Sequence, residues 1–188
     1  MILKLVEFLL TWQWPADEND IFLQSITIKY NPIATTCDFS NKGLVVNLPI
    51  VSISDIKNIN RPGYQLFTLN FSYSDFLAGN KTTRNIVMFL ASNNLHSADK
   101  TVLINTIQQG AKGVGFRLVH RNKTLSPILF SSSESVQGNA TSIFNIAAGS
   151  ALAPSFSIDM GAYYYAYDLN NLSTGKIIST ATLVFSYD

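Results

Sequence analysis

Two histidines and one cysteine are the side chains of this 188-residue chain best suited to bind a metal or act as a nucleophile. His96 and His120 stand 24 positions apart, outside any His-Glu-x-x-His frame, and no pair of cysteines accompanies them. Zinc sites need closely grouped His, Cys or acidic ligands, so we expect no metal site. Cys37 has no second cysteine to bridge to, and we expect a buried structural thiol.

Three glycines, Gly110, Gly113 and Gly115, could belong to a phosphate-binding loop. They lack the terminal Gly-Lys-Ser/Thr of such loops, and a strand-like segment follows them instead of the helix that would hold the phosphate. The chain also lacks a Gly-x-Ser-x-Gly elbow, and its carboxylates are scattered. A carboxylate pair set across a groove is the one enzymatic alternative. We expect a protein that is not an enzyme and has no cofactor.

The composition excludes further classes of function. Apolar residues make up 47% of the chain and charged residues 13%, with a net charge of +1. This balance gives no basic surface for nucleic acid or for an anionic membrane. No segment reaches the roughly 18 apolar residues that a membrane-spanning helix needs.

Short strand-like segments separated by turn residues recur along the chain. Residues 64–73 alternate most clearly, with Phe67, Leu69 and Phe71 on one side and Thr68 on the other. Further segments of this kind are residues 21–30, 43–50, 84–91, 113–120, 142–147, 156–167 and 176–187. Strands of this length and spacing are typical of an antiparallel sandwich or barrel, so we expect an all-β fold.

Two segments permit more than one interpretation. Residues 97–109 are the best helical candidate in a chain with weak helical periodicity. The run from Tyr163 to Tyr167 contains four tyrosines, with Tyr163, Tyr165 and Tyr167 on one face of a strand. It is either a stacking platform for a sugar or a central strand whose tyrosines pack in the core or at its rim, and we favour the second.

The first twenty residues differ in character from the rest. Residues 1–10 are apolar but short, and residues 15–20 form a polar, acidic, turn-like break. No Ala-x-Ala-like cleavage site follows the apolar stretch, so it makes a poor signal peptide. We divide the chain into an N-terminal segment, 1–20, and one domain, 21–188. The segment is a donor extension, a failed signal peptide or the remnant of an upstream domain.

The last strand-like segment carries the most informative pattern. Apolar side chains alternate with hydroxyl-bearing ones, as Ile177, Ala181, Leu183, Phe185 and Tyr187 against Thr180, Thr182 and Ser186. An apolar strand at the edge of a sheet has free backbone N–H and C=O groups that pair with another chain. Either another strand covers this one inside the domain, or pairing with a partner is its function.

This end of the chain resembles chaperone–usher pilins, which carry a penultimate Tyr and a Gly fourteenth from the C-terminus. Tyr187 and Gly175 occupy those places. Three further parts resemble the same family, in the family's order. Residues 34–39 with 45–49 are similar to the first cysteine and Val-x-Leu-Pro strand, 64–71 to the Phe-x-Ile-x-Leu strand, and 113–118 to the Gly-Val-Gly-Ile-x-Leu strand. Together they cover roughly residues 21–188.

The resemblance implies an all-β, incomplete immunoglobulin-like β-sandwich (the pilin fold) that lacks its final strand. The gap is a hydrophobic groove beside the C-terminal strand. A periplasmic chaperone first lends a strand to it, and at the outer-membrane usher the N-terminal extension of a neighbouring subunit replaces that strand. The residues implied in these contacts are Gly175, Ile177, Ala181, Leu183, Phe185, Tyr187 and Asp188, whose terminal carboxylate a basic pair of the chaperone would hold.

The chain departs from the family at one cysteine. The family's second cysteine, bridged to the first, would fall at about Tyr73, 36 positions after Cys37. The bridge is therefore absent, and loss of a loop closure of this length removes roughly 3–4 kcal/mol of stability. We expect a subunit that depends more on its core and its partners.

The resemblance implies a structural or adhesive subunit of a bacterial surface fimbria, which is extracellular after passing through the periplasm. Shaft or adaptor pilin and the pilin domain of a tip adhesin both fit, and an adhesin would add a host glycan receptor to the partners. The alternative is a secreted, non-polymerising carbohydrate-binding β-sandwich. That protein would need neither the apolar terminal strand nor Gly175.

Overall fold

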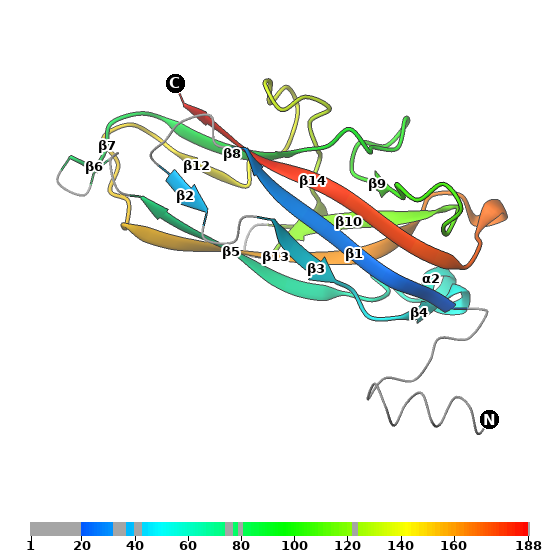
Figure 1. The fold of residues 1–188 in the computed structure, drawn as a ribbon. Helices are drawn as coiled ribbons and strands as arrows, with labels where there is room; N and C mark the ends of the chain where they lie inside the picture. The colour runs from blue at the N-terminus through cyan, green and yellow to red at the C-terminus, as the bar shows by residue number, and fades with distance from the viewer. Residues whose placement is uncertain are drawn as a thin grey trace, which may run out of the picture.

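A computed structural model of the chain describes residues 20–31, 37–39, 43–73, 77–78, 81–121 and 124–187. Two six-stranded sheets pack face to face (Figure 1). This arrangement confirms the all-β sandwich predicted from the alternating segments. Residues 1–19 lie outside the described residues, so the division of the chain at residue 20 remains a prediction.

The first sheet joins strands from both ends of the described chain. Its order is β12 (Phe144–Ile146), β8 (Ile86–Ala91), β14 (Gly175–Tyr187), β1 (Asp20–Asn31) and β3 (Leu44–Asn47), with β4 (Val51–Ser52) also paired to β1. β1 runs parallel to β14 and antiparallel to β3 and β4. The two long strands lie side by side across the front of the molecule in Figure 1.

The second sheet has the order β11 (Thr124–Pro127), β10 (Val114–His120), β13 (Ser155–Ala166), β5 (Gln65–Tyr73) and β2 (Cys37–Phe39). β9 (Leu103–Ile104) pairs with Gly115 and Phe116 near the start of β10. The strands β6 (Leu77–Ala78) and β7 (Lys81–Thr82) form a separate small hairpin. Every pair of named strands in the second sheet is antiparallel, as predicted for a sandwich of this kind.

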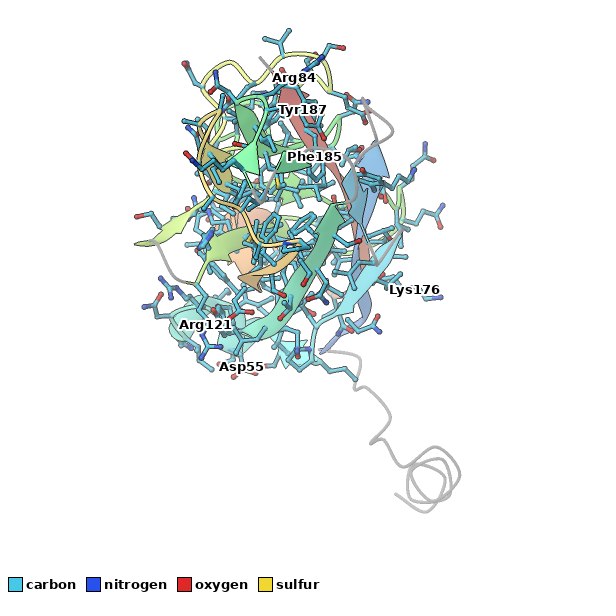
Figure 2. All side chains as sticks on the ribbon, turned by 90° about the vertical axis from the view of Figure 1, so that its left-hand side faces the viewer. Asp55, Arg84, Arg121, Lys176, Phe185 and Tyr187 are labelled. Carbon is cyan, nitrogen blue, oxygen red and sulfur yellow. The ribbon has the colours of Figure 1, made fainter. Side chains whose placement is uncertain are left out.

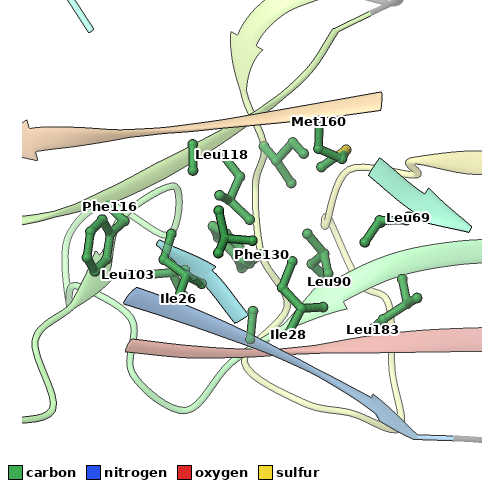
Figure 3. Packing of buried hydrophobic residues seen from close by; sticks show 14 of the residues in the cluster. Ile26, Ile28, Leu69, Leu90, Leu103, Phe116, Leu118, Phe130, Met160 and Leu183 are labelled. Carbon is green, nitrogen blue, oxygen red and sulfur yellow. The ribbon is translucent and has the colours of Figure 1, made fainter. Parts of the chain in front are cut away.

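The core lies between the two sheets and takes alternate residues from the facing strands (Figure 3). Ile26 and Ile28 of β1 and Leu183 of β14 are fully buried on one side. Leu69 of β5 and Met160 of β13 are fully buried on the other. On β1 and β5 the period-2 pattern of the sequence therefore marks the buried face, because successive side chains of a strand point to opposite sides of the sheet. β8 and β10 are buried on both faces.

The helix predicted at residues 97–109 is wrong. That stretch is an irregular connection that contains only the two residues of β9. The Asp99 N–H donates to Nδ1 of His96 at 3.2 Å, and the Asp99 carboxylate accepts from the Thr101 N–H at 2.9 Å. Such local bonds between side chains and backbone compete with helix formation, which explains the difference.

The described chain instead has an α-helix at α2 (Ile53–Asn58), which the periodicity analysis missed. Its start is fixed by a capping box, in which Ser52 accepts from the Asp55 N–H at 3.1 Å and Asp55 accepts from the Ser52 N–H at 3.1 Å. Six residues are too few for a helical repeat to show in the sequence. A short 3-10 turn, η1 (Leu169–Asn171), precedes β14. In the described part of the chain, neither helix could cross a membrane.

Candidate subunit interface

The side chains that were predicted as contacts on β14 divide into a buried group and an end group. Ile177, Ala181, Leu183 and Phe185 have no exposed surface and face the core between the sheets. Tyr187 is half-buried at the end of the strand, beyond Phe185, as Figure 2 shows. Asp188 lies outside the described residues. A partner strand could reach the buried group only from the edge of β14, in the plane of the sheet.

β1 occupies that edge in this structure. Its residues pair in parallel with β14 from Gln24 opposite Ile177 to Asn31 opposite Val184. On its other side β1 pairs with β3, where Ile26 lies opposite Val46. Of the two possibilities left by the sequence, the strand that covers β14 therefore comes from within the domain. We call the space between β14 and β3, now filled by β1, the strand slot.

Aromatic side chains pack together around Phe185, near the C-terminal end of β14 in the strand slot. Phe185 meets Tyr30 of β1 edge to face, with ring centroids 5.4 Å apart, and Phe71 of β5 at 5.8 Å. Tyr187 stacks against Phe185 with centroids 6.4 Å apart. Pairs of this kind contribute about 0.5–1.5 kcal/mol each beyond the area they bury. Any strand that takes the slot must present a side chain that packs against Phe185.

The opposite edge of β14 is held by two different structures. Its C-terminal half pairs with β8, from Thr182 opposite Ala91 to Tyr187 opposite Ile86. Its N-terminal half is bound by the connection that follows β9. There, Nδ2 of Asn105 donates to the Lys176 carbonyl at 2.9 Å, and the Ile178 carbonyl accepts from the backbone N–H of Thr106 at 2.9 Å. The edge of β14 opposite β1 is therefore bonded along both of its halves.

Gly175 begins β14 in a backbone conformation that favours glycine. Its φ is +132°, and a Cβ atom there would lie 3.1 Å from the backbone N of Ala111. That same N–H donates to the Lys176 carbonyl at 2.9 Å. The structure thus explains why this place needs a glycine: a side chain would disturb the first bond that holds β14 against its neighbour.

The register of β2 and β5 places Cys37 opposite Tyr73. These are the two positions at which the resemblance puts the bridged cysteines. The chain has Cys37 as its single cysteine, so no internal disulfide can form. The structure therefore agrees with the expected position of the missing bridge.

Arginine side chains lie over two rings of the tyrosine run. On the outer face of β13, the Arg117 guanidinium carbon lies 3.3 Å from the Tyr165 ring centroid, and that of Arg61 lies 5.8 Å from the Tyr163 centroid. Tyr164 points the other way, into the core, and donates its hydroxyl to the Pro49 carbonyl at 3.0 Å. A cavity of about 250 Å³ lies beside these rings. The packing interpretation of the run is the one that the contacts favour.

A salt bridge anchors one of these arginines. Nη2 of Arg117 lies 2.6 Å from Oδ2 of Asp99. Partial burial of Asp99 opposes its ionisation, but hydrogen bonds from Thr101 and from Arg117 outweigh that effect and hold the pKa of the carboxyl below its usual value. The network ties the connection before β9 to the face of the second sheet.

Comparison with known proteins identifies the family. Residues 24–188 match the family described as "Fimbrial protein". The chain belongs to the fimbrial protein family. This fimbrial protein is 28% identical over 184 residues to the uncharacterised fimbrial-like protein YehA of Escherichia coli K12. That match covers 92% of this chain but 49% of YehA, so the chain spans about half the length of its relative.

Solved structures support the fold of this fimbrial protein. The P pilus rod subunit PapA superimposes with a TM-score of 0.56 at 10% identity, covering 81% of this chain and 99% of PapA. A subunit from a chaperone–usher pilus studied for rod uncoiling gives a TM-score of 0.56 at 12% identity, covering 81% of this chain and 87% of the other. The immunoglobulin-like pilin sandwich predicted from the sequence is therefore confirmed.

The family also sets the general class of function. Fimbrial proteins are structural components of surface fimbriae, where subunits assemble with one another. This membership agrees with a structural role and an extracellular location. The carbohydrate-binding alternative is not favoured.

Proposed function

We propose that this fimbrial protein is assembled into a fimbria by strand complementation at the strand slot, as a structural or adhesive subunit. The observation that carries the proposal is the difference between the two edges of β14. One edge is bonded to β8 and to the connection after β9, whereas the other meets a strand from the far end of the described chain. The slot is the place where a strand from another protein can replace a strand of the chain itself.

An incoming strand would take over the contacts that β1 now makes. Ile26 and Ile28 are fully buried in the slot, and Tyr30 packs on Phe185. Fully burying one such side chain stabilises a protein by about 1.5–3 kcal/mol. Leaving the slot empty would therefore cost several kcal/mol, so a replacement must carry alternate apolar side chains of its own. This is β-augmentation, with backbone bonds for affinity and pockets for specificity.

The proposed partners act in sequence. A periplasmic chaperone occupies the slot first and binds the terminal carboxylate of Asp188, the outer-membrane usher then receives the complex, and a neighbouring subunit finally supplies the strand. The buried residues of β14 line the contact, and Tyr187 lies at its rim. Parallel pairing is slightly weaker per residue than antiparallel pairing, which supports β1 as the replaceable member of the pair.

Weakening β1 tests this proposal directly. Thr27 pairs with Thr180 of β14 and Val45 of β3, so Thr27→Pro removes a backbone donor and disturbs both ladders. We expect the full chain with Thr27→Pro to co-purify with its cognate chaperone several-fold more than the unchanged chain does, and to aggregate without the chaperone. Thr27→Ala is the matched control and should behave like the unchanged chain. A Thr27→Pro chain that stays monomeric and binds no chaperone would contradict the proposal.

A further inference from the structure

The core-facing row of β14 contains one polar side chain in an otherwise apolar row. Ser179 stands between Ile177 and Ala181, and all three are fully buried. The Ser179 hydroxyl has no hydrogen-bond partner among the described residues. Buried hydroxyls are nearly always paired, because losing water without gaining another bond is unfavourable. The unpaired Ser179 hydroxyl therefore suggests that a different strand in the slot would supply a hydrogen-bond partner for it.

The residue beside Ser179 in the slot cannot pair with it. In the β1–β14 register Ser179 lies opposite Ile26, which is fully buried and whose side chain has no polar atom. Partners in register on neighbouring strands lie close enough for their side chains to touch. A hydroxyl or amide at the position of Ile26 would be placed to bond Ser179.

Two further features show that β1 fits the slot imperfectly. The β1–β14 pair is the only parallel one among the named strands of the described ranges. Its register also shifts between Ile21 and Gln24, so the ladder is interrupted near the start of β14. Each feature weakens the hold of β1 on β14 without exposing the apolar residues of the slot.

We propose that the strand slot is specific for a partner strand that carries a hydroxyl or amide side chain opposite Ser179, between apolar side chains that fill the rest of the slot. The proposal rests on the proposed function, since it describes the strand that complementation would bring. Ser179 then acts as a specificity-determining residue. It disfavours the chain's own β1 and favours a partner strand of the right pattern.

Peptides with the sequence of residues 20–31 provide the probe. One labelled peptide carries Ile26→Thr and the other Ile26→Val, two side chains of nearly the same shape that differ in the hydroxyl. Their binding to the full chain, unchanged or with Ser179→Ala, is measured by fluorescence anisotropy. We expect the Ile26→Thr peptide to bind about tenfold more tightly than the Ile26→Val peptide to the unchanged chain. With Ser179→Ala we expect that preference to disappear.

The same comparison within the chain makes the test independent of peptide entry. Ile26→Thr and Ile26→Val are introduced into the full chain with and without Ser179→Ala, and urea midpoints are measured. We expect the difference in stability between the Ile26→Thr and Ile26→Val chains to favour Ile26→Thr more when Ser179 is present than when it is replaced by Ala. An equal Thr-to-Val difference in both backgrounds would overturn the inference. Peptides that bind without this preference would also count against it while leaving strand complementation intact, whereas failure of Thr27→Pro to recruit chaperone strikes the proposed function.

Discussion

Asn105 is joined to Ile178 as a residue of an adjacent strand would be, with its side-chain Oδ1 accepting the Ile178 N–H at 3.0 Å. The same side chain donates through Nδ2 to the Lys176 carbonyl at 2.9 Å and to the Ala111 carbonyl at 3.0 Å. One amide thus extends the backbone pairing of β14 where β8 ends. It holds the first half of β14 on the edge opposite β1.

Replacing Asn105 by Asp should weaken this hold. The carboxylate cannot donate, so the Ala111 carbonyl would lose its bond from the side chain and the Lys176 carbonyl would keep only the bond from the Ala111 N–H. The negative charge would also face both carbonyl oxygens. We expect Asn105→Asp to lower the free energy of unfolding by about 2 kcal/mol, measured by urea denaturation at neutral pH. Asn93→Asp is the matched control, because Asn93 is exposed in the connection between β8 and β9. Equal losses for both variants would refute this role of Asn105.

Gly175→Ala tests the start of β14. The substitution forces a side chain into a backbone with φ of +132° and brings its Cβ to within 3.1 Å of the Ala111 N atom. Such strained positions cost about 1–3 kcal/mol, and we expect a loss of that size in thermal or urea unfolding. Gly149→Ala separates the two causes, since Gly149 has φ of +80° but open space around its Cβ. The loss at Gly175 should be the larger one, and the reverse order would show that the contact with Ala111 is unimportant.

The sequence predicted strands such as β5 well because burial on one side produces a period of two in the sequence, whereas β8 and β10 are buried on both faces and show it less clearly. Leu69 and Phe71 are buried on β5 as their alternation predicts. The pattern of alternation did not predict which strands pair with one another. The parallel contact of Ile28 with Ala181 joins residues far apart in the chain, and its direction depends on how the whole sheet assembles. A period of two tells which face is buried, not which strand is the neighbour.

The parts of the interface that the sequence missed are those made by polar groups and backbone. The row of apolar side chains on β14 was visible, and so was the glycine at its start. Asn105 was not, because an isolated Asn in a connection carries no sign of a bond to residues such as Lys176, 71 positions away. Ser179 broke the apolar row without showing that its hydroxyl lacks a partner. Both facts depend on distances that exist only in the folded chain.

Acid should weaken the salt bridge between Asp99 and Arg117. The pKa of Asp99 is lowered in the folded chain, so its carboxylate contributes stability above the unfolded pKa, near 3.9, and loses it as the pH falls through the lower folded value. The pair is partly exposed, so we expect less than about 1 kcal/mol. Asp99→Asn should therefore be less stable than the unchanged chain at pH 6, and the two should converge as the pH approaches 2. A gap that stays constant over this range would exclude the carboxylate's charge as its cause.

Restoring the missing disulfide is the strongest test of the β2–β5 register. Cys37 and Tyr73 are directly opposed, and such residues in antiparallel strands have Cα atoms about 4.5–5.5 Å apart, within the range that a disulfide spans. Tyr73→Cys should therefore form a bridge under oxidising conditions and stabilise the chain by roughly 3–4 kcal/mol, since it closes a long loop of the unfolded chain. We expect the melting temperature to rise by about 10 °C and the gain to vanish with reductant.

Ser72→Cys is the control for that bridge. Ser72 lies opposite Asp38, and its side chain points to the other face of β5. The variant therefore also has two cysteines, at positions 37 and 72, but their side chains lie on opposite faces and cannot form a bridge. It should show no gain that depends on reductant. A bridge in Ser72→Cys, or none in Tyr73→Cys, would mean that β2 and β5 pair in a different register. A shift by one residue would exchange the two faces of β2. Formation of the disulfide therefore reports the register in which β2 pairs with β5.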